Sequence, residues 1–165
     1  FAGGAQGGRL DGAVLLAPFL QHDAPTTRKN SGGWATVNLR RVIGLTILNA
    51  LHITALNGLP VIRFAMPKVV LDGPMGSTAT TEYSFRLNSS FSPRRDWAGD
   101  VARLPVFLVV AGTADEAFVA EAYEPTLSAY TSKGRYVLVP QVGHLAIVQA
   151  QETAYQIVQF LDTLK

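Results

Sequence analysis

Three short runs of residues with few polar positions predict the strands of a sheet. They span residues 13–17, 105–111 and 135–139, and the first two are apolar at every position. Strands that are half exposed usually alternate apolar with polar residues, whereas continuous apolar runs are typical of strands buried on both faces. A proline or glycine directly follows each run and predicts its end. The pattern therefore favours a buried parallel sheet.

Two segments after the second run predict helices. Pro125 suits a first helical turn and Lys133-Gly134 is typical of a helix end, so we expect a helix at about residues 125–132. Within residues 151–164, apolar side chains recur on one helical stripe. Strands alternating with helices predict an α/β fold with right-handed crossovers. Because three strands make a small sheet, we expect them to be part of a larger fold.

The long separation between the first two runs predicts an insertion with structure of its own, because loops of this length are uncommon in compact domains. Residues 37–56 are rich in Leu, Ile and Val and predict one or two helices that are apolar on more than one side. Residues 73–93 are dense in Ser, Thr, Gly and Pro and predict irregular structure. A short helix at residues 96–103 would lead back into the sheet.

The amino-acid composition argues against several classes of protein and several kinds of site. Apolar residues make up 48% and charged residues 16% of the 165, which argues against disorder. The net charge is only +2 and the basic residues occur as scattered pairs, so we expect no nucleic-acid partner. Cysteine is absent, which excludes disulfides, thiolate zinc ligands and a thiol nucleophile. The three histidines show no H-E-x-x-H spacing, so we expect no metal site.

Candidate chemistry lies where the second and third strands end. Asp115 follows the second run and His144 follows the third, 29 residues later. The carboxyl ends of parallel strands lie at one edge of a sheet, where open α/β sheets bind ligands. There an aspartate can fix the tautomer of a histidine whose other nitrogen acts as a general base. Alone, Asp115 would more often be a turn cap and His144 a structural residue, but their pairing and order favour catalysis.

The same residues carry a family resemblance. Residues 105–115 (PVFLVVAGTAD) resemble the penultimate core strand and acid turn of the α/β-hydrolases, and residues 139–145 (VPQVGHL) resemble their last strand and histidine loop. The likeness is strongest to the group of lysophospholipases, monoacylglycerol lipases and serine aminopeptidases. Residues 13–19 (AVLLAPF) resemble the strand that follows the nucleophile helix in that group. The resemblance is specific at the two turns and looser between them.

The resemblance implies three regions and a mostly helical lid. Residues 1–20 would hold the end of the helix after the nucleophile and a core strand, with residues 1–4 as the tail of that helix. Residues 21–101 would form the lid. Residues 102–165 would form the C-terminal part of the hydrolase core, with Asp115 as the triad acid and His144 as the base.

The nucleophile should precede both of these residues. In the family it is a serine in a G-x-S-x-G turn, which we expect roughly 20 to 35 residues before the strand at Ala13. Neither Ser31 nor Ser77 has a glycine two residues before and two residues after it. We therefore expect the serine on an N-terminal segment of the same protein, and expect this chain alone to be inactive. A truncated, non-catalytic product is the alternative.

The implied reaction is hydrolysis of a carboxylic ester through an acyl-enzyme, without a metal or organic cofactor. Phe118 and Leu145, beside the two turns, are candidates for the wall of the substrate pocket. The aliphatic part of the lid could line an acyl-chain tunnel or touch a membrane surface, or could simply be lid core. We prefer a hydrophobic ester substrate. An aminopeptidase, an epoxide hydrolase, a dehalogenase or a non-catalytic binding module remain alternatives on the same fold.

Overall fold

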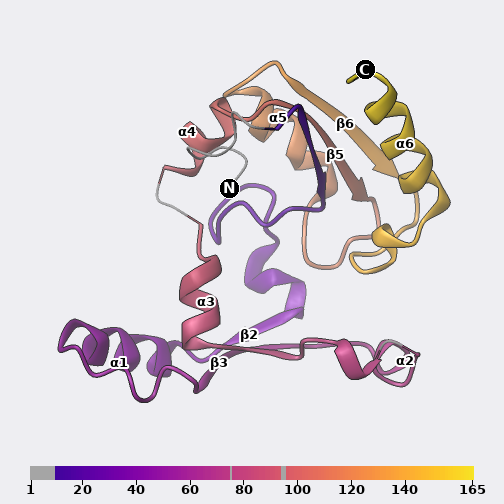
Figure 1. Cartoon of the computed structure of the whole chain (residues 1–165). Helices are drawn as coiled ribbons and strands as arrows, with labels where there is room; N and C mark the ends of the chain where they lie inside the picture. Colours follow the sequence, from indigo (N-terminus) through magenta and orange to yellow (C-terminus); the bar gives the residue numbers. More distant parts are fainter. Residues whose placement is uncertain (1–9, 75, 94–95) are drawn as a thin grey trace. The chain divides into compact units, whose positions relative to one another are not determined.

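The computed structural model describes residues 10–74, 76–93 and 96–165, and its chain forms two compact units (Figure 1). The first unit combines Phe1–Lys29 with Pro93–Lys165, and the second is Asn30–Ser92. The helix tail expected at residues 1–4 lies outside the described residues. We call the first part the core unit and the second the insertion unit, and describe each by itself.

The core unit contains a parallel sheet of three strands. They are β1 (Gly12–Leu16), β5 (Val106–Gly112) and β6 (Gly134–Val139), in the order β1-β5-β6. Both neighbouring pairs are parallel. The three strands predicted from the apolar runs are therefore confirmed to within a residue at each end, and so is the α/β fold class. Because β5 and β6 are parallel neighbours, the loops after them begin at the same edge of the sheet.

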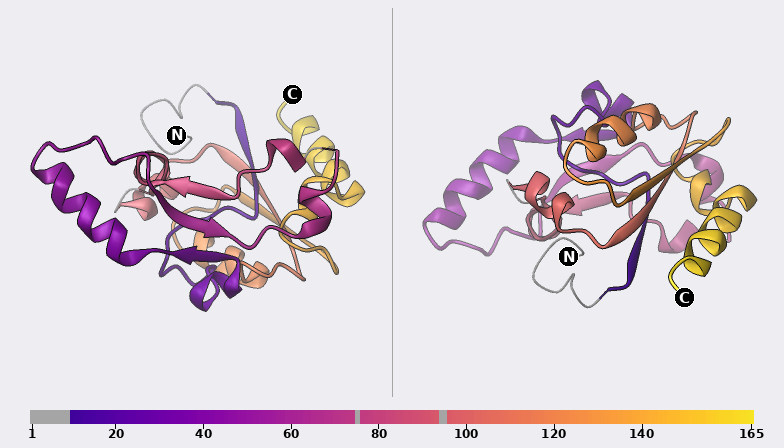
Figure 2. Two further views of the ribbon diagram at one scale, coloured as in Figure 1. Left: turned by 90° about the horizontal axis from the view of Figure 1, so that it is seen from below. Right: turned by 90° about the horizontal axis from the view of Figure 1, so that it is seen from above.

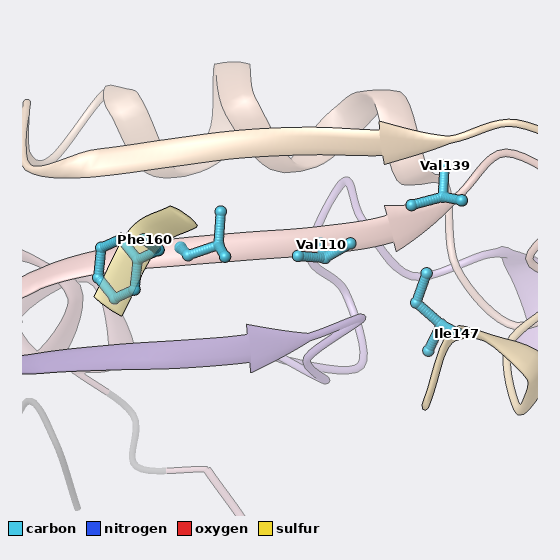
Figure 3. Close-up of a cluster of buried hydrophobic side chains, with 5 residues drawn as sticks. Val110, Val139, Ile147 and Phe160 are labelled. Carbon is cyan, nitrogen blue, oxygen red and sulfur yellow. The ribbon is translucent and has the colours of Figure 1, made fainter. Parts of the chain in front are cut away.

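One face of the sheet packs against the C-terminal helix α6 (Gln151–Asp162). Alternate residues of β5, Leu108 and Val110, are buried with Phe160 of that helix and with Val139 and Ile147. Figure 3 shows four of these residues, Phe160, Val110, Ile147 and Val139, spread along the sheet. Each large side chain removed from water here contributes roughly 1.5–3 kcal/mol. The predicted C-terminal helix is confirmed, ending two residues earlier than residue 164.

The opposite face is covered by the connection between β5 and β6, which contains η4 (Ala120–Ala122) and α5 (Tyr123–Ser128). Tyr123 and Leu127 of α5 are buried, as are Phe107 and Val109 of β5. Figure 2 shows α5 and α6 on opposite sides of the sheet. This double cover explains why β5 is apolar throughout. The helix expected at residues 125–132 starts two residues earlier and ends at Ser128.

A short helix leads back into the sheet, as the sequence predicts. It is α4 (Trp97–Ala102), and the Asp96 side chain caps it by accepting a hydrogen bond from the Gly99 amide at 3.0 Å. The turn after β6 contains the short helix η5 (Ala146–Val148).

The insertion unit contains an antiparallel sheet that sequence analysis missed. Its strands are β2 (Ala35–Val37), β3 (Pro60–Phe64) and β4 (Glu82–Ser84), with β3 in the middle. Two of them have only three residues, too few to show an alternating pattern. Figures 1 and 2 show α1 (Leu39–Ala50) and α2 (Lys68–Leu71) at opposite ends of this sheet. The segment η2 (Lys29–Gly33), whose residues 30–32 have positive φ and are not helical, leads into this unit, which also contains the short helix η3 (Gly76–Thr78).

The expectation of irregular structure at residues 73–93 is wrong, because β4 and α3 (Phe85–Phe91) lie there. Serine normally favours loops, but Ser84 caps α3 by accepting from the Leu87 amide at 3.2 Å. Ser89 and Ser90 donate to carbonyls four residues back, within the helix. The content of Ser, Thr, Gly and Pro therefore gave the wrong prediction for this region.

Helix α1 is apolar on two opposite faces. Leu45 on one face is buried with Val61 and Phe85, and these residues form the core of the insertion unit. On the other face Ile43 and Ile47, one turn apart, are 52% and 57% exposed. The region expected to hold one or two helices that are apolar on more than one side therefore contains one such helix.

Candidate active site

Asp115 lies in the turn that follows β5, which we call the acid turn (residues 113–118). Its side chain is fully buried. The Oδ1 atom accepts hydrogen bonds from the backbone amides of Ala117 and Phe118, both at 2.8 Å. The turn thus folds around its own carboxylate and fixes the direction of the second oxygen, Oδ2.

His144 lies in the loop after β6, which we call the His loop (residues 140–145). Its Nδ1 atom is 3.0 Å from Oδ2 of Asp115. The imidazole is 21% exposed, whereas the carboxylate behind it is inaccessible to solvent. A buried acid that holds Nδ1 leaves Nε2 as the nitrogen through which the ring can exchange protons with a substrate.

The surroundings of Asp115 favour its ionised form. Burial by itself raises the pKa of the carboxyl group. The hydrogen bond from His144, the amides of Phe118 and Ala117, and the electrostatic attraction of His144 act in the opposite direction, so the pKa lies below its ordinary value of 3.8. Asp115 is therefore a carboxylate at neutral pH, ready to stabilise a positive charge on the imidazole.

The His loop passes close to Gly112, the last residue of β5. A Cβ atom at this position would collide with the backbone carbonyl of Val142. The same carbonyl accepts a hydrogen bond from the Ala114 amide at 3.1 Å. Only two glycines among the described residues, Gly32 and Gly33, have a positive φ. Gly112 is thus required by the close approach of the His loop to the end of β5, and not by an unusual backbone angle.

Two side chains of the acid turn hold the backbone of the His loop. The Thr113 hydroxyl accepts from the Gln141 amide at 2.9 Å, and Oε2 of Glu116 accepts from the His144 amide at 3.0 Å. Gln141 has a φ of 60°, which is uncommon for a residue other than glycine. The His loop therefore adopts a conformation that the acid turn helps to maintain.

A third segment, residues 26–28, lies against the acid turn in antiparallel fashion. Thr27 pairs with Phe118, and the Arg28 amide donates to the Ala117 carbonyl at 3.2 Å. Nε of Arg28 also donates to the backbone carbonyl of Asp115 at 2.9 Å. No local sequence pattern indicates the roles of Arg28, Thr113 and Glu116, because their hydrogen bonds join segments far apart in the chain.

The two candidate pocket residues differ in their surroundings. Phe118 is buried, and its ring lies edge-on to the imidazole of His144, with 5.1 Å between ring centroids. It also lies near the ring of Phe19, at 6.3 Å. Leu145 is half-buried and directly precedes η5. Phe118 thus contacts the candidate base, while Leu145 is adjacent to it in the chain.

Neither serine of the core unit lies at the edge of the sheet that carries Asp115 and His144. Ser128 ends α5 and Ser132 precedes β6, so both lie near the amino end of that strand. The carboxyl end of β6, by contrast, leads to the His loop. The core unit consequently offers an acid and a base at one edge of the sheet, and its own serines at the other.

Two other features, a metal-binding cluster and a membrane-spanning helix, are absent from the part of the chain that the structure describes. Residues 10–74, 76–93 and 96–165 contain no group of three or more acidic or histidine side chains that could hold a metal ion. Across the same residues, no helix has the length and apolar character needed to cross a membrane.

Comparison with solved structures identifies the fold. A candidate non-heme bromoperoxidase from Mycobacterium tuberculosis superposes with a TM-score of 0.54 over 94% of this chain, at 15% sequence identity. The fold is that of an α/β-hydrolase. A thermophilic esterase from Thermogutta terrifontis gives a TM-score of 0.47 and 16% identity over 94% of this chain. No protein-family model and no curated protein matches the sequence.

The chain spans 59% of the bromoperoxidase structure and 57% of the esterase structure. In α/β-hydrolases the triad runs nucleophile, acid, histidine along the chain. The core unit carries Asp115 and His144 in that order, in the loops that follow β5 and β6 at one edge of the sheet.

Proposed function

We propose that this chain supplies the acid and base of a serine hydrolase that cleaves carboxylic esters through an acyl-enzyme. The observation that carries the proposal is the 3.0 Å contact between Oδ2 of the buried Asp115 and Nδ1 of His144. Burying a carboxylate is costly unless it is hydrogen-bonded and paired, and here the partners include the ring of a partly exposed histidine, which Asp115 orients.

In the first half of the reaction, His144 removes a proton from the serine hydroxyl through Nε2. The serine oxygen attacks the ester carbonyl carbon, and the C=O π electrons move to the oxygen. As the tetrahedral intermediate collapses, the bond to the alcohol oxygen breaks and His144 returns its proton to that oxygen. Asp115 stays ionised throughout and stabilises the imidazolium, consistent with its lowered pKa.

In the second half, His144 removes a proton from water as the water oxygen attacks the acyl-enzyme carbonyl. Collapse of this intermediate breaks the bond to the serine oxygen, which takes the proton back from His144. The carboxylic acid product leaves and the serine is restored. Each step moves protons only between oxygen and the imidazole, and no step of the proposed reaction requires a metal or an organic cofactor.

The proposed nucleophile is a serine on a segment N-terminal to residue 1 in the complete protein. Two observations support this location. The order of acid and histidine leaves the nucleophile to precede both. In the insertion unit, the hydroxyls of Ser89, Ser90 and Ser92 donate to helix carbonyls, and that of Ser84 caps α3. These serines have structural roles within their own unit.

The proposed substrate is a hydrophobic ester of the lysophospholipid or acylglycerol kind. Phe118, stacked edge-on against His144, is proposed to form part of the pocket wall beside the reacting carbonyl, and Leu145 another part. Apolar walls near the histidine favour an acyl chain over a peptide. The insertion unit is proposed to serve as the lid of this pocket.

Contact with a membrane surface is part of the same proposal. Helix α1 exposes Leu39, Ile43 and Ile47 on one face, each more than half accessible. The helix also carries Arg40 and Arg41 and no acidic residue. An exposed apolar face with basic residues beside it fits the surface of an anionic bilayer, where a lipid ester would be found.

The test is intact mass spectrometry of the complete protein before and after treatment with a fluorophosphonate, which labels only an activated serine. The expected result is a single adduct, which peptide mapping places on a serine N-terminal to residue 1. Labelling should slow strongly in His144→Ala. An unlabelled protein would overturn the serine mechanism, and an aspartate nucleophile on the same fold would give that result.

A further inference from the structure

We infer that Glu116 is a positioning residue that holds the backbone of the catalytic histidine. The inference deepens the proposed function, because it adds a residue to the same site. Its basis is the 3.0 Å hydrogen bond from the His144 amide to Oε2 of Glu116. Glu116 immediately follows Asp115 in the chain, so two neighbouring acids of one turn hold the same histidine at two points.

The two acids act on different parts of His144. Asp115 contacts the ring through Nδ1, which sets the tautomer and the ring direction. Glu116 contacts the main-chain amide, which sets where the Cα atom of His144 lies relative to the acid turn. A ring held only through Nδ1 could still shift with its backbone, and such shifts lower the rate because the base must lie within hydrogen-bond reach of the nucleophile.

Gly143, which precedes His144, lies beside the hydrogen bond between Glu116 and the His144 amide. A Cβ atom at Gly143 would lie 3.1 Å from Oε2 of Glu116, closer than most Cβ contacts, and 3.8 Å from the Ala114 carbonyl. The φ of Gly143 is not positive, so its backbone conformation is open to other residues. Gly143 therefore leaves room for the carboxylate to reach the next amide.

A second hydrogen bond joins the acid turn to the His loop. The Thr113 hydroxyl accepts from the Gln141 amide, three residues before His144. Thr113 and Glu116 are also three residues apart, so the acid turn holds the His loop near both ends. Glu116 is exposed, whereas Asp115 beside it is buried. Because the exposed Glu116 side chain contributes little to the hydrophobic core, we expect it to be replaceable without a large loss of stability. Its role can therefore be tested by mutation.

The experiment compares Glu116→Ala and Glu116→Gln in the complete protein. Two readouts are used: kcat and KM with a p-nitrophenyl ester, and hydrogen exchange of the His144 amide measured by NMR. In Glu116→Ala we expect kcat to fall about tenfold at unchanged KM, and the amide to exchange at least about tenfold faster. Glu116→Gln keeps an acceptor oxygen and should restore both to within about threefold of wild type.

Glu121→Ala is the matched control, because Glu121 is an exposed glutamate of the same connection between β5 and β6. It should change neither readout. The inference is overturned if Glu116→Ala leaves amide exchange at His144 within about twofold of wild type, or if it raises KM at constant kcat. Should the complete protein lack esterase activity, the proposed function fails, while amide exchange still decides whether Glu116 holds His144.

Discussion

Oδ2 of Asp115 lies 3.0 Å from Nδ1 of His144, although the two residues are 29 positions apart in the chain. Their contact depends on β5 and β6 being parallel neighbours, so that the turns after them start at one edge of the sheet. It also depends on the Ala117 and Phe118 amides, which occupy the other oxygen of the carboxylate. The pairing is thus a product of topology and local turn geometry together.

Replacing Asp115 by asparagine should leave the fold in place and remove most of the activity. An amide cannot hold the correct imidazole tautomer or stabilise its charged form, so we expect kcat to fall about 10³- to 10⁴-fold. The measurement is ester turnover by the complete protein, with circular dichroism to confirm folding. Asp162→Asn, at an exposed aspartate in the last turn of α6, should retain full activity. Similar rates for the two variants would contradict the assigned role.

The Asp115 carboxylate should also make stability depend on pH. Its pKa in the folded protein lies below the ordinary value of 3.8, so the folded state favours the ionised form. That contribution is fully present above the unfolded pKa and is lost as the pH falls through the folded pKa. Wild type should therefore lose its stability advantage over Asp115→Asn as the pH falls below about 4. Urea unfolding of both proteins from neutral pH to the acid transition measures this, and a constant difference would refute it.

Gly112→Ala should destabilise the protein and lower its activity. The added Cβ atom would collide with the Val142 carbonyl, forcing the acid turn and His loop apart. We expect a loss of about 2 kcal/mol in the free energy of unfolding, together with reduced kcat.

The same substitution at Gly44 provides the control, since no atom lies within 4 Å of a Cβ there. Gly44 is inside α1, where alanine is a better helix former, so Gly44→Ala should stabilise by about 1 kcal/mol. Thermal unfolding of the two variants distinguishes crowding at Gly112 from a general effect of replacing glycine.

The two faces of α1 should respond differently to mutation. Serine at both Ile43 and Ile47, which are exposed, should change stability by less than about 1 kcal/mol. It should weaken binding to vesicles that contain anionic lipid, and slow turnover of long-chain more than short-chain esters. Leu45→Ala on the buried face should instead cost about 2–5 kcal/mol.

Vesicle sedimentation and a series of ester chain lengths measure these effects. If the double serine variant binds vesicles as wild type does, the apolar face of α1 does not contact lipid. A large loss of stability in that variant would instead mean that the face packs against another part of the complete protein.

The sequence by itself determined the three strands and the C-terminal helix of the core unit. β5 is apolar at every position because a helix covers each of its faces, and that pattern is visible without coordinates. Asp115 and His144 could be selected because each follows a strand, and the parallel arrangement brings strand ends together. The apolar strand pattern thus sufficed to predict that Asp115 and His144 lie close together.

The tertiary structure alone decided the rest. β2 and β4 of the insertion unit are stabilised by pairing with β3. Each is too short for its own residues to show the alternating pattern of a strand. Hydrogen bonds to backbone atoms of distant segments are formed by the side chains of Thr113, Glu116 and Arg28. Nearly all residues have the same backbone atoms, so the sequence does not show which of them a side chain will contact. From the sequence, Gly112 could be recognised only as the residue that ends the second apolar run. The Val142 carbonyl, which leaves no room for a side chain at Gly112, approaches it only in the folded protein.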